Sequence, residues 1–546
     1  MFKKKLSLVL AAAMAFSIAV TGCGNNDNTA TGSTPDSSEA GNASSESSGG
    51  SADDGASSSA DADGSYRVAT VRWADWGEFY HVGFPDDAAA EVGIEISWDT
   101  ILNSDWGDRK AVLLAGGDLP DAFLGSICFG EGDILNSVGT FIALEDYIDE
   151  YMPNFKAILE SDPTMKALAY SADGHIYGLP SKKPCRPTVA NQVFINQTWL
   201  DNLGLTMPST YEEFVEVLRA FRDQDANGNG DPSDEIPYGE GYADSVMFFC
   251  LPFGTTIGAD NTNLMAVKNG TPIFLPVQEE YKEAIEWMHD CMAEGLVDTE
   301  IFTQDDSTRD GKLMSETPII GVAPGWTADS TFGANADQYV ALPALTGPDG
   351  NAYISSDPEH WNYTRCEFMV TTACENPGPL LAWADQFYTE DASIQTFYGS
   401  FGVGVQKNDD GTYTVLEPND GNSADTFAWI NSLRDFGPKY VADGFNDKVI
   451  YAGENGDASK LALDEQMKQY AREAYPNVSY TVEQTERLGD IYTDIGSYVT
   501  SMQAEWVTNG GVNEGWDSYI DMLNQMGYEE FIQIENDAYN TYKANQ

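Results

Sequence analysis

Alternating apolar and polar positions at the start of the folded region predict strands separated by helices. Residues 67–73 alternate small or apolar with polar side chains, and residues 94–98 repeat this pattern. The stretch from Asp105 to Gly116 predicts a helix, and residues 121–124 predict a third, short strand. Strands that alternate with helices indicate an α/β fold with a mostly parallel sheet, in which ligands bind beyond the carboxyl ends of the strands.

The clearest helix is predicted to start after Thr210. Thr210 and Glu213 fit a capping box, and the apolar residues that follow fall on one helical face, namely Phe214, Val217, Leu218 and Phe221. A similar stripe runs from Trp516 to Met526 and stops at Gly527, which fits a C-cap. A last helix continues from Phe531. We expect these stripes to face a core.

The first 22 residues have the pattern of an export signal. Three lysines precede an apolar run from Leu6 to Val20, which is too short to span a bilayer and ends in small residues. Its end, Val-Thr-Gly-Cys, resembles the lipobox of bacterial lipoproteins, in which the cysteine is lipid-modified. We therefore expect Cys23 to anchor the mature chain to the outer face of the cell membrane; an ordinary signal peptide with a chance cysteine is the alternative.

Residues 23–65 are expected to form a disordered linker. They hold no Lys or Arg and no aromatic residue, so they bury too little apolar surface to offset the entropy of ordering. A flexible coil of this length reaches about 35 Å, which suits a tether. The body that follows, 66–546, is long enough for two or three cores.

Charge and cysteine content exclude some functions. Without residues 1–22, the chain keeps 25 basic and 87 acidic residues, a net charge of −62, which repels phosphate backbones and excludes nucleic acid as a partner. The six cysteines after Cys23 lack metal-ligand spacing, so we expect buried free thiols. No further long apolar run follows, so we expect no transmembrane helix.

An acidic loop after the helix at 210–222 predicts a structural calcium site. Oxygen-bearing side chains at alternate positions, with glycines between them, let a short loop surround a hard cation. We assign side-chain ligation to five residues and a backbone carbonyl to a sixth, Asp231; the five are Asp225, Asn227, Asn229, Asp234 and Glu235. Counting from Asp223 gives an EF-hand-like register instead, with Gly228 sixth and Asp234 twelfth. A solvated Asn/Gly turn is the plain alternative.

Aromatic residues in predicted loops favour a carbohydrate cleft, because rings stack on sugars while neighbouring polar groups bind hydroxyls. The candidate ligand-binding residues lie after the predicted strands and among Gly, Pro and polar residues: Trp73, Asp75, Trp76, Phe79, Trp106, Ser126, Phe129, Trp326 and Trp361. Burial in a core is the alternative for any one of them. Catalytic signals are weak, with four histidines and no HExxH, GxSxG or phosphate-binding glycine motif.

Several segments together resemble the extracellular solute-binding proteins of carbohydrate ABC importers, of the long lipoprotein type. The resemblance covers 66–546 and rests on segments that match family motifs: Leu113 to Asp121 ("ASGDLPD"), Gly174 to Pro180 ("GKIYGLP"), Asn196 with Trp199 to Pro208 ("N…WLDKLGL..P"), the loop ending Asp234-Glu235-Ile236-Pro237, Asn376 to Tyr388, and Trp506 to Gly527. One extra residue precedes the Asp-Glu pair of the acidic loop, which leaves the calcium ligand set open.

The resemblance implies a two-lobed, periplasmic-binding-protein-like α/β fold with a hinge and an interlobe ligand cleft. Lobe 1 would comprise 66–185 and 338–398, and lobe 2 would comprise 186–337 and 399–546. Trp326 would lie on a loop of lobe 2 whose tryptophan stacks on sugar. The function implied is capture of an oligosaccharide by a monomeric, non-enzymatic receptor that delivers it to membrane permease subunits. A secreted polysaccharide-degrading enzyme and a receptor for peptides or other small solutes are the competing hypotheses.

Overall fold

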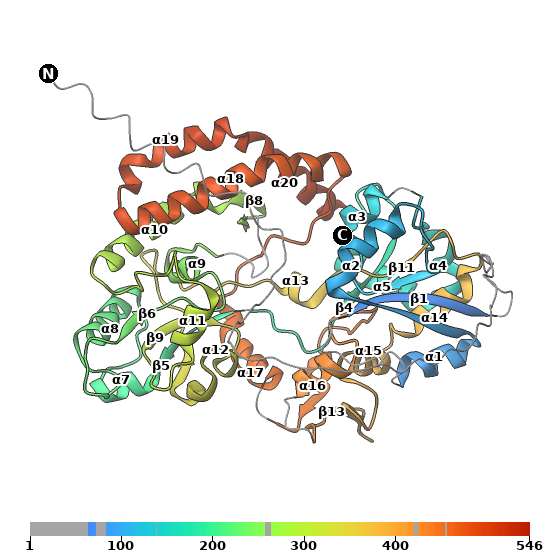
Figure 1. Ribbon diagram of the computed structural model, residues 1–546, viewed down its shortest axis with the longest axis horizontal. Helices are drawn as coiled ribbons and strands as arrows, with labels where there is room; N and C mark the ends of the chain where they lie inside the picture. The colour runs from blue at the N-terminus through green and yellow to red at the C-terminus, as the bar shows by residue number, and fades with distance from the viewer. Residues whose placement is uncertain are drawn as a thin grey trace, which may run out of the picture. The chain divides into compact units, whose positions relative to one another are not determined.

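The computed structural model describes residues 64–72, 83–137, 139–189, 191–256, 264–419, 424–453 and 456–546. The export signal, Cys23 and the linker lie outside the described residues, as do Trp73, Asp75, Trp76 and Phe79. Two large sheets organise the described chain, each covered by its own helices (Figure 1). Within the described ranges, no helix is both long and apolar enough to cross a membrane.

The first sheet has the order β2-β1-β3-β11-β4. Its strands are β1 (Ser65–Arg72), β2 (Glu95–Leu102), β3 (Ala122–Leu124), β4 (Gly178–Lys182) and β11 (Tyr363–Val370). The helices around it are α1 (Phe84–Val92), α2 (Asn103–Leu114), α3 (Glu131–Asn136), α4 (Glu145–Tyr151), α5 (Pro153–Ser161), α6 (Pro163–Ala169), α14 (Pro377–Gln386) and α15 (Glu390–Tyr398). The predicted strands and the 105–116 helix are thus confirmed within a few residues.

The expectation of a mostly parallel sheet holds for only part of this sheet. β1 pairs in parallel with β2 and β3, but β11 pairs antiparallel with β3 and β4. The reason is the chain path, because β11 returns from the second sheet and enters the first from the opposite direction. β1 is buried along most of its length, as expected for a strand covered on both faces.

A β-bulge interrupts the pairing of β11 with β4. Between Thr364 and Phe368 three residues of β11 stand opposite Pro180 alone, which has no N–H to donate. The bulge passes so close to β4 that a Cβ at Gly178 would lie 2.7 Å from the Cα of Cys366. Cys366 itself has a φ of +58°. The bulge therefore requires glycine at 178 and sets the direction of Glu367.

The second sheet has the order β10-β5-β9-β6. Its strands are β5 (Gln192–Asn196), β6 (Ile236–Tyr238), β9 (Ile320–Gly325) and β10 (Tyr339–Ala341), with a hairpin of β7 (Met265–Lys268) and β8 (Thr271–Phe274) nearby in sequence. The helices that belong with it are α7 (Gln197–Leu203), α8 (Tyr211–Asp223), α9 (Ser245–Phe249), α10 (Glu279–Ala293), α11 (Asp306–Leu313) and α12 (Ala328–Phe332).

Helix α8 starts where the sequence predicts. The Thr210 hydroxyl accepts a hydrogen bond from Glu213 N at 3.2 Å, whereas the Glu213 carboxylate turns to Ser209 N and Oγ. The N-cap is therefore confirmed, with Ser209 in place of the Thr210 backbone as partner of the carboxylate. Its apolar stripe is buried as expected: Phe214, Val217, Leu218 and Phe221.

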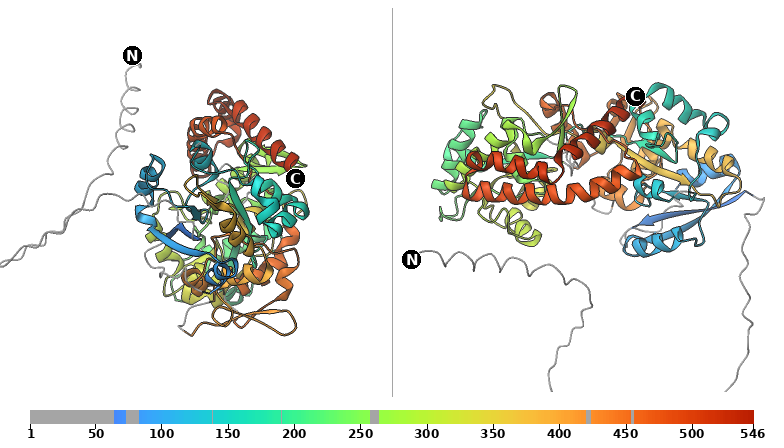
Figure 2. Two further views of the ribbon diagram at one scale, coloured as in Figure 1. Left: turned by 90° about the vertical axis from the view of Figure 1, so that its right-hand side faces the viewer. Right: turned by 90° about the horizontal axis from the view of Figure 1, so that it is seen from above.

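Three C-terminal helices join the core of the second sheet; the first two pack beside α10, and the third packs on those two and on β8. They are α18 (Val482–Asn509), α19 (Val512–Gln525) and α20 (Tyr528–Asn545), and the two views of Figure 2 show them in red, side by side. Gly527, between α19 and α20, has a φ of +104°, a conformation that favours glycine. The stripe that begins at Trp516 is buried there, which confirms its predicted core role.

A third, small sheet packs on α15. It comprises β12 (Val405–Lys407), β13 (Tyr413–Val415) and β14 (Val449–Tyr451), with α16 (Ala424–Asn431) between β13 and β14 and α17 (Asp457–Met467) after β14. Its core includes Cys185, Phe397 and Tyr398. All six cysteines of the described chain are free and buried, as predicted.

The chain passes between the two sheets twice, and a third passage, residues 468–481, leads to the C-terminal helices that join the core of the second sheet. Residues 183–191 connect β4 to β5, and residues 342–362, which include α13 (Pro358–Asn362), connect β10 to β11. The boundary expected at 338 thus falls before β10, which pairs with β5 of the second sheet. The two connections run side by side, because Lys183 N donates to Asn362 O at 2.7 Å and Asp357 N donates to Thr188 O at 3.3 Å.

Candidate functional site

Two of the predicted aromatic residues are packed into the core of the first sheet. Trp106 and Phe129 lie with their ring centroids 5.3 Å apart, among Phe123 and Phe141. The Trp106 indole donates to Cys128 O at 3.0 Å, and Phe129 is 1% exposed. Because both rings are enclosed by core side chains, neither offers a free face in this conformation.

Trp326 and Trp361 are brought together from different elements. Trp326 follows the end of β9, whereas Trp361 lies in α13 on the second connection. Their ring centroids are 4.9 Å apart at an interplanar angle of 46°, and both residues are only partly buried. This pair is the aromatic centre of the candidate site.

Two cations flank the tryptophan pair. The Arg186 guanidinium, from the first connection, lies 5.5 Å from the Trp361 ring centroid and 5.7 Å from that of Trp326. Lys460, from α17, places its ammonium 4.4 Å from the Trp326 centroid and donates to Trp326 O at 3.1 Å. The Arg186 distances are those of cation–π contacts. Burial lowers the pKa of Lys460 to about 7, so Lys460 holds Trp326 in both protonation states through its hydrogen bond to Trp326 O.

Asp435 faces three cations without a close contact to any of them. Its carboxylate lies 3.9 Å from Lys183 Nζ, 3.8 Å from Arg186 Nη2 and 3.8 Å from Arg434 Nε. These distances exceed those of hydrogen bonds. Burial alone would raise the pKa of Asp435, but the charges of Arg186, Lys183 and Arg434 hold it below its usual value, so the group is a carboxylate.

Unsatisfied polar atoms surround the same point. Arg186 Nε, Asp435 Oδ1 and the Trp361 indole N–H are buried without a hydrogen-bond partner, and so is Arg434 Nη1. Buried polar groups are normally paired, because leaving one unpaired costs about 1–3 kcal/mol. These unpaired donors and the unpaired Asp435 acceptor lie around one point. A ligand hydroxyl suits them, because it can accept a hydrogen bond from one group and donate to another.

A second polar group involves the predicted Ser126. Ser126 N and Oγ donate to the Glu367 carboxylate at 3.1 and 3.2 Å, and Gly437 N donates to it at 2.8 Å. The β11 bulge aims Glu367 at these partners. Lys439 lies close by, and burial lowers its pKa to about 7 although Glu367 opposes this shift. Ser126 itself is half-buried, with its hydroxyl already engaged.

The acidic loop between α8 and β6 holds itself together through its own side chains. Glu235 Oε1 accepts from Ala226 N at 2.8 Å, and Asp225 Oδ2 accepts from Gly230 N at 2.9 Å. The Asp234 carboxylate accepts from the amides of Asn227 and Asn229 at 3.1 and 2.6 Å. Asp231 Oδ1 accepts from Ser233 Oγ at 2.6 Å, so the Asp231 side chain is hydrogen-bonded within its local turn.

Two oxygens of this loop remain unsatisfied. Asp225 Oδ1 and Glu235 Oε2 are buried without a hydrogen-bond partner, and burial raises the pKa of Glu235. Oxygens of this kind fit a hard cation. Among the described residues, no three His, Cys, Asp or Glu side chains are arranged as metal ligands, so a calcium ion here would need the asparagines and backbone carbonyls as well.

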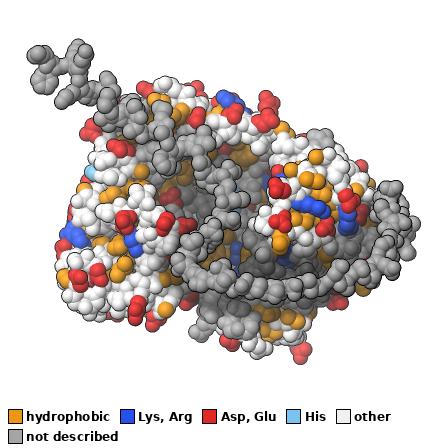
Figure 3. All heavy atoms as spheres, in the orientation of Figure 1, with side chains coloured by type: hydrophobic (Ala, Val, Ile, Leu, Met, Phe, Trp, Pro, Cys, Tyr) orange, Lys and Arg blue, Asp and Glu red, His pale blue; other side chains and the backbone are white. Residues whose placement is uncertain are grey.

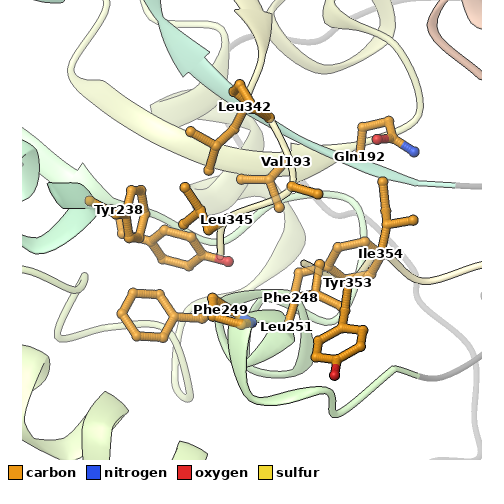
Figure 4. Close-up of a pocket in the computed structure, with 14 residues that line it drawn as sticks. Gln192, Val193, Tyr238, Phe248, Phe249, Leu251, Leu342, Leu345, Tyr353 and Ile354 are labelled. Carbon is orange, nitrogen blue, oxygen red and sulfur yellow. The ribbon is translucent and has the colours of Figure 1, made fainter. Parts of the chain in front are cut away.

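One further pocket lies within the second sheet's own core. It is lined mainly by apolar side chains from β5, β6, α9 and the start of the second connection, among them Tyr238, Phe249 and Leu345 (Figure 4). Such a lining offers few groups that could bind a polar ligand. The space-filling view shows acidic side chains scattered over the visible described surface, which suits the strongly negative net charge (Figure 3).

Sequence reasoning missed the charged residues of the site. Arg186, Asp435 and Lys460 come from three distant segments and carry no motif. The one available signal is the setting of Arg186, which stands between Cys185 and Pro187 in a chain with only 28 basic residues.

Comparison with known proteins finds bacterial solute-binding proteins. The family model of bacterial extracellular solute-binding proteins matches residues 73–314. The fructooligosaccharide ABC transporter substrate-binding protein FusA of Streptococcus pneumoniae is 30% identical over 475 residues, which cover 84% of this chain and 86% of FusA.

Solved structures of such proteins share the fold. An HMO-binding solute-binding protein associated with an ABC transporter of Bifidobacterium longum infantis matches with a TM-score of 0.76 at 27% identity, over 88% of this chain and 99% of that one. FusA in complex with kestose matches with a TM-score of 0.71 at 27% identity, over 88% and 100% of the two chains. A further FusA structure, in complex with fructo-nystose, is of an EF-hand mutant.

Proposed function

Because the chain belongs to the bacterial extracellular solute-binding protein family, we propose that it captures an oligosaccharide outside the cell and delivers it to an ABC importer. The single observation that carries the choice of ligand is the pairing of Trp326 and Trp361 beside unsatisfied polar groups of Arg186 and Asp435. Aromatic rings bind the apolar face of a sugar, and the polar groups bind its hydroxyls.

Relatives support a carbohydrate as the ligand. FusA is named for fructooligosaccharides and has been solved with kestose, and the Bifidobacterium protein is described as HMO-binding. These relatives are binding proteins and not enzymes, which supports capture without chemical change over the degradative alternative. The size and linkage of the sugar bound by this chain are set by the contacts around Trp326 and Trp361.

Closure of the two lobes would couple capture to delivery. The site draws residues from the second sheet, from both connections and from the segment after α16, so a ligand bound there contacts several parts of the chain. Such a ligand stabilises the closed form by its greater affinity for that form. The closed form would then dock on the permease, while a lipid at Cys23 and the 23–65 linker hold the protein near the membrane.

A calcium ion in the acidic loop would stabilise the second lobe. Asp225 Oδ1 and Glu235 Oε2 are the buried oxygens that wait for a partner, whereas Asp223 pairs with Arg222 at 2.7 Å. These oxygens support Asp225 and Glu235 as ligands, and the EF-hand-like register that begins at Asp223 is the alternative. The existence of an EF-hand mutant of FusA supports a cation site in this group of proteins.

The proposed function is tested by thermal melting of the purified chain with a glycan panel. The panel holds fructooligosaccharides, milk oligosaccharides and uronic-acid oligosaccharides, with peptides and polyamines as the competing solutes. We expect a bound glycan to raise the melting temperature by an amount that grows with the logarithm of its concentration above Kd. Stabilisation by a peptide or a polyamine alone would overturn the carbohydrate assignment.

A further inference from the structure

Cys185 has an unusual backbone conformation next to the candidate site. Its φ is +58°, in the left-handed region that few residues other than glycine and asparagine adopt. It forms a turn with Pro184 on the first connection between the sheets. A turn with proline ahead of a left-handed residue ordinarily takes glycine or asparagine at that second position.

This left-handed residue decides where its neighbours point. In an extended chain, successive side chains face opposite sides, so Lys183 and Arg186 would point away from each other. Instead both approach the same oxygen, Asp435 Oδ1, at 3.9 and 3.8 Å. The turn at Cys185 therefore directs both cations to one side, and Pro187 then restricts the backbone of Arg186 to an extended conformation.

The burial of the Cys185 thiol explains why this position holds cysteine and not glycine. Cys185 is 1% exposed and packs with Phe397, Tyr398 and neighbouring residues of the small-sheet core. Its N–H donates to Asn446 Oδ1 at 2.9 Å. Glycine would permit the turn but would leave it free to move, whereas the buried thiol fixes it against a packed core.

The residue that this turn directs is itself unsatisfied. The Arg186 side chain is 10% exposed, its Nε has no hydrogen-bond partner, and its guanidinium faces both Trp326 and Trp361. Resting on the proposed function, we propose that Cys185 is a positioning residue, whose left-handed backbone and buried thiol hold Arg186 against the tryptophan pair for ligand binding.

The test is a double-mutant cycle between Cys185→Val and Arg186→Ala, read by calorimetric titration with kestose. Valine is β-branched and is excluded from this backbone conformation, so the turn must change and Arg186 must leave the site. Each single variant is expected to weaken binding about tenfold, the effect of losing about one hydrogen bond to a charged group. The double variant is expected to bind no more weakly than either single one.

Three further variants separate positioning from a general loss of packing. Cys185→Gly keeps the turn accessible but removes the thiol that fixes it, so it is expected to bind more weakly than the wild type and more tightly than Cys185→Val, because glycine adopts a positive φ without strain. Cys185→Ala removes the thiol alone. Cys250→Val is the matched control, since Cys250 is fully buried at an ordinary φ of −84°, and it is expected to leave the affinity unchanged.

Losses that multiply in the double variant, or wild-type affinity in Cys185→Val, would overturn the inference. A measurement without ligand tests the role of Cys185 independently of the proposed function. The tryptophan emission should shift alike in Cys185→Val, in Arg186→Ala and in the double variant. Independent, additive shifts would also overturn it. If the wild type binds no glycan of the panel, the proposed function fails, and the emission cycle alone decides the role of Cys185.

Discussion

The rings of Trp326 and Trp361 lie 4.9 Å apart, although one follows a strand of the second sheet and the other belongs to the segment that leads back to the first. Arg186 approaches both rings from the other connection. The meeting point of the two connections is thus also the meeting point of the aromatic and charged side chains. A ligand held there contacts the segments whose bending would open or close the lobes.

Replacing either tryptophan of this pair by alanine should weaken carbohydrate binding. We expect a loss of at least about tenfold, or about 1.4 kcal/mol, for Trp326→Ala and for Trp361→Ala, because each removes a stacking face. Calorimetric titration measures the affinity. Trp287→Phe is the control, since Trp287 stacks on Phe249 at 4.4 Å in the second core. Unchanged affinity in both tryptophan variants, or an equal loss in the control, would contradict the assignment.

Calcium should stabilise the protein through Asp225 and Glu235. In differential scanning calorimetry, calcium is expected to raise the melting temperature of the wild type and EDTA to lower it, since an ion that binds only the folded chain stabilises it. Asp225→Ala should abolish the calcium-dependent part. Asp231→Ala should retain it, because the Asp231 side chain bonds Ser233. Equal calcium responses in both variants would rule out the proposed ligand set.

Between about pH 7 and 9, below the range in which the buried thiols titrate, stability should rise with pH because of Lys460, with Lys439 acting in the same direction. Burial lowers the pKa of Lys460 from 10.5 to about 7, although Asp464 opposes the shift. In that window the unfolded chain binds a proton that the folded chain does not, so raising the pH favours folding. Chemical denaturation at several pH values measures the slope. Lys460→Met should reduce it, and an unchanged slope would show that Lys460 keeps its ordinary pKa.

The buried pair of Arg434 and Asp457 should be costly to break from one side. Arg434 Nη2 donates to both Asp457 oxygens at 2.9 and 2.8 Å, and Tyr398 OH donates to the same carboxylate at 2.8 Å. Arg434→Ala leaves a buried carboxylate without its cation, which costs about 3–5 kcal/mol. Urea denaturation tests this value. Glu465→Ala, at the exposed pair with Lys468, should cost less than about 1 kcal/mol.

Local patterns predicted the local elements well. The alternation at 67–73, the cap at Thr210 and the stripe at Trp516 all correspond to observed elements, because each depends on neighbours a few residues away. Antiparallel β11 was not predictable in this way. Its direction follows from a second passage between sheets, and no short segment records that path.

The site was predictable only in its aromatic part. Trp326 and Trp361 stood out as rings among Gly, Pro and polar residues, yet Trp106 and Phe129 stood out equally and lie in a core. Whether a ring in a loop is enclosed depends on which distant residues pack on it. Arg186, Asp435 and Lys460 were missed for the same reason, since their contacts join distant segments of the chain.

The central claim is that the protein binds an oligosaccharide and releases it unchanged. The most direct test is calorimetric titration with the glycan that most stabilises the chain, followed by mass analysis of the sugar recovered after denaturation. We predict one site per chain and a sugar of unaltered mass. Shortened sugar in the recovered fraction, or no heat with any glycan while another solute binds, would contradict the account.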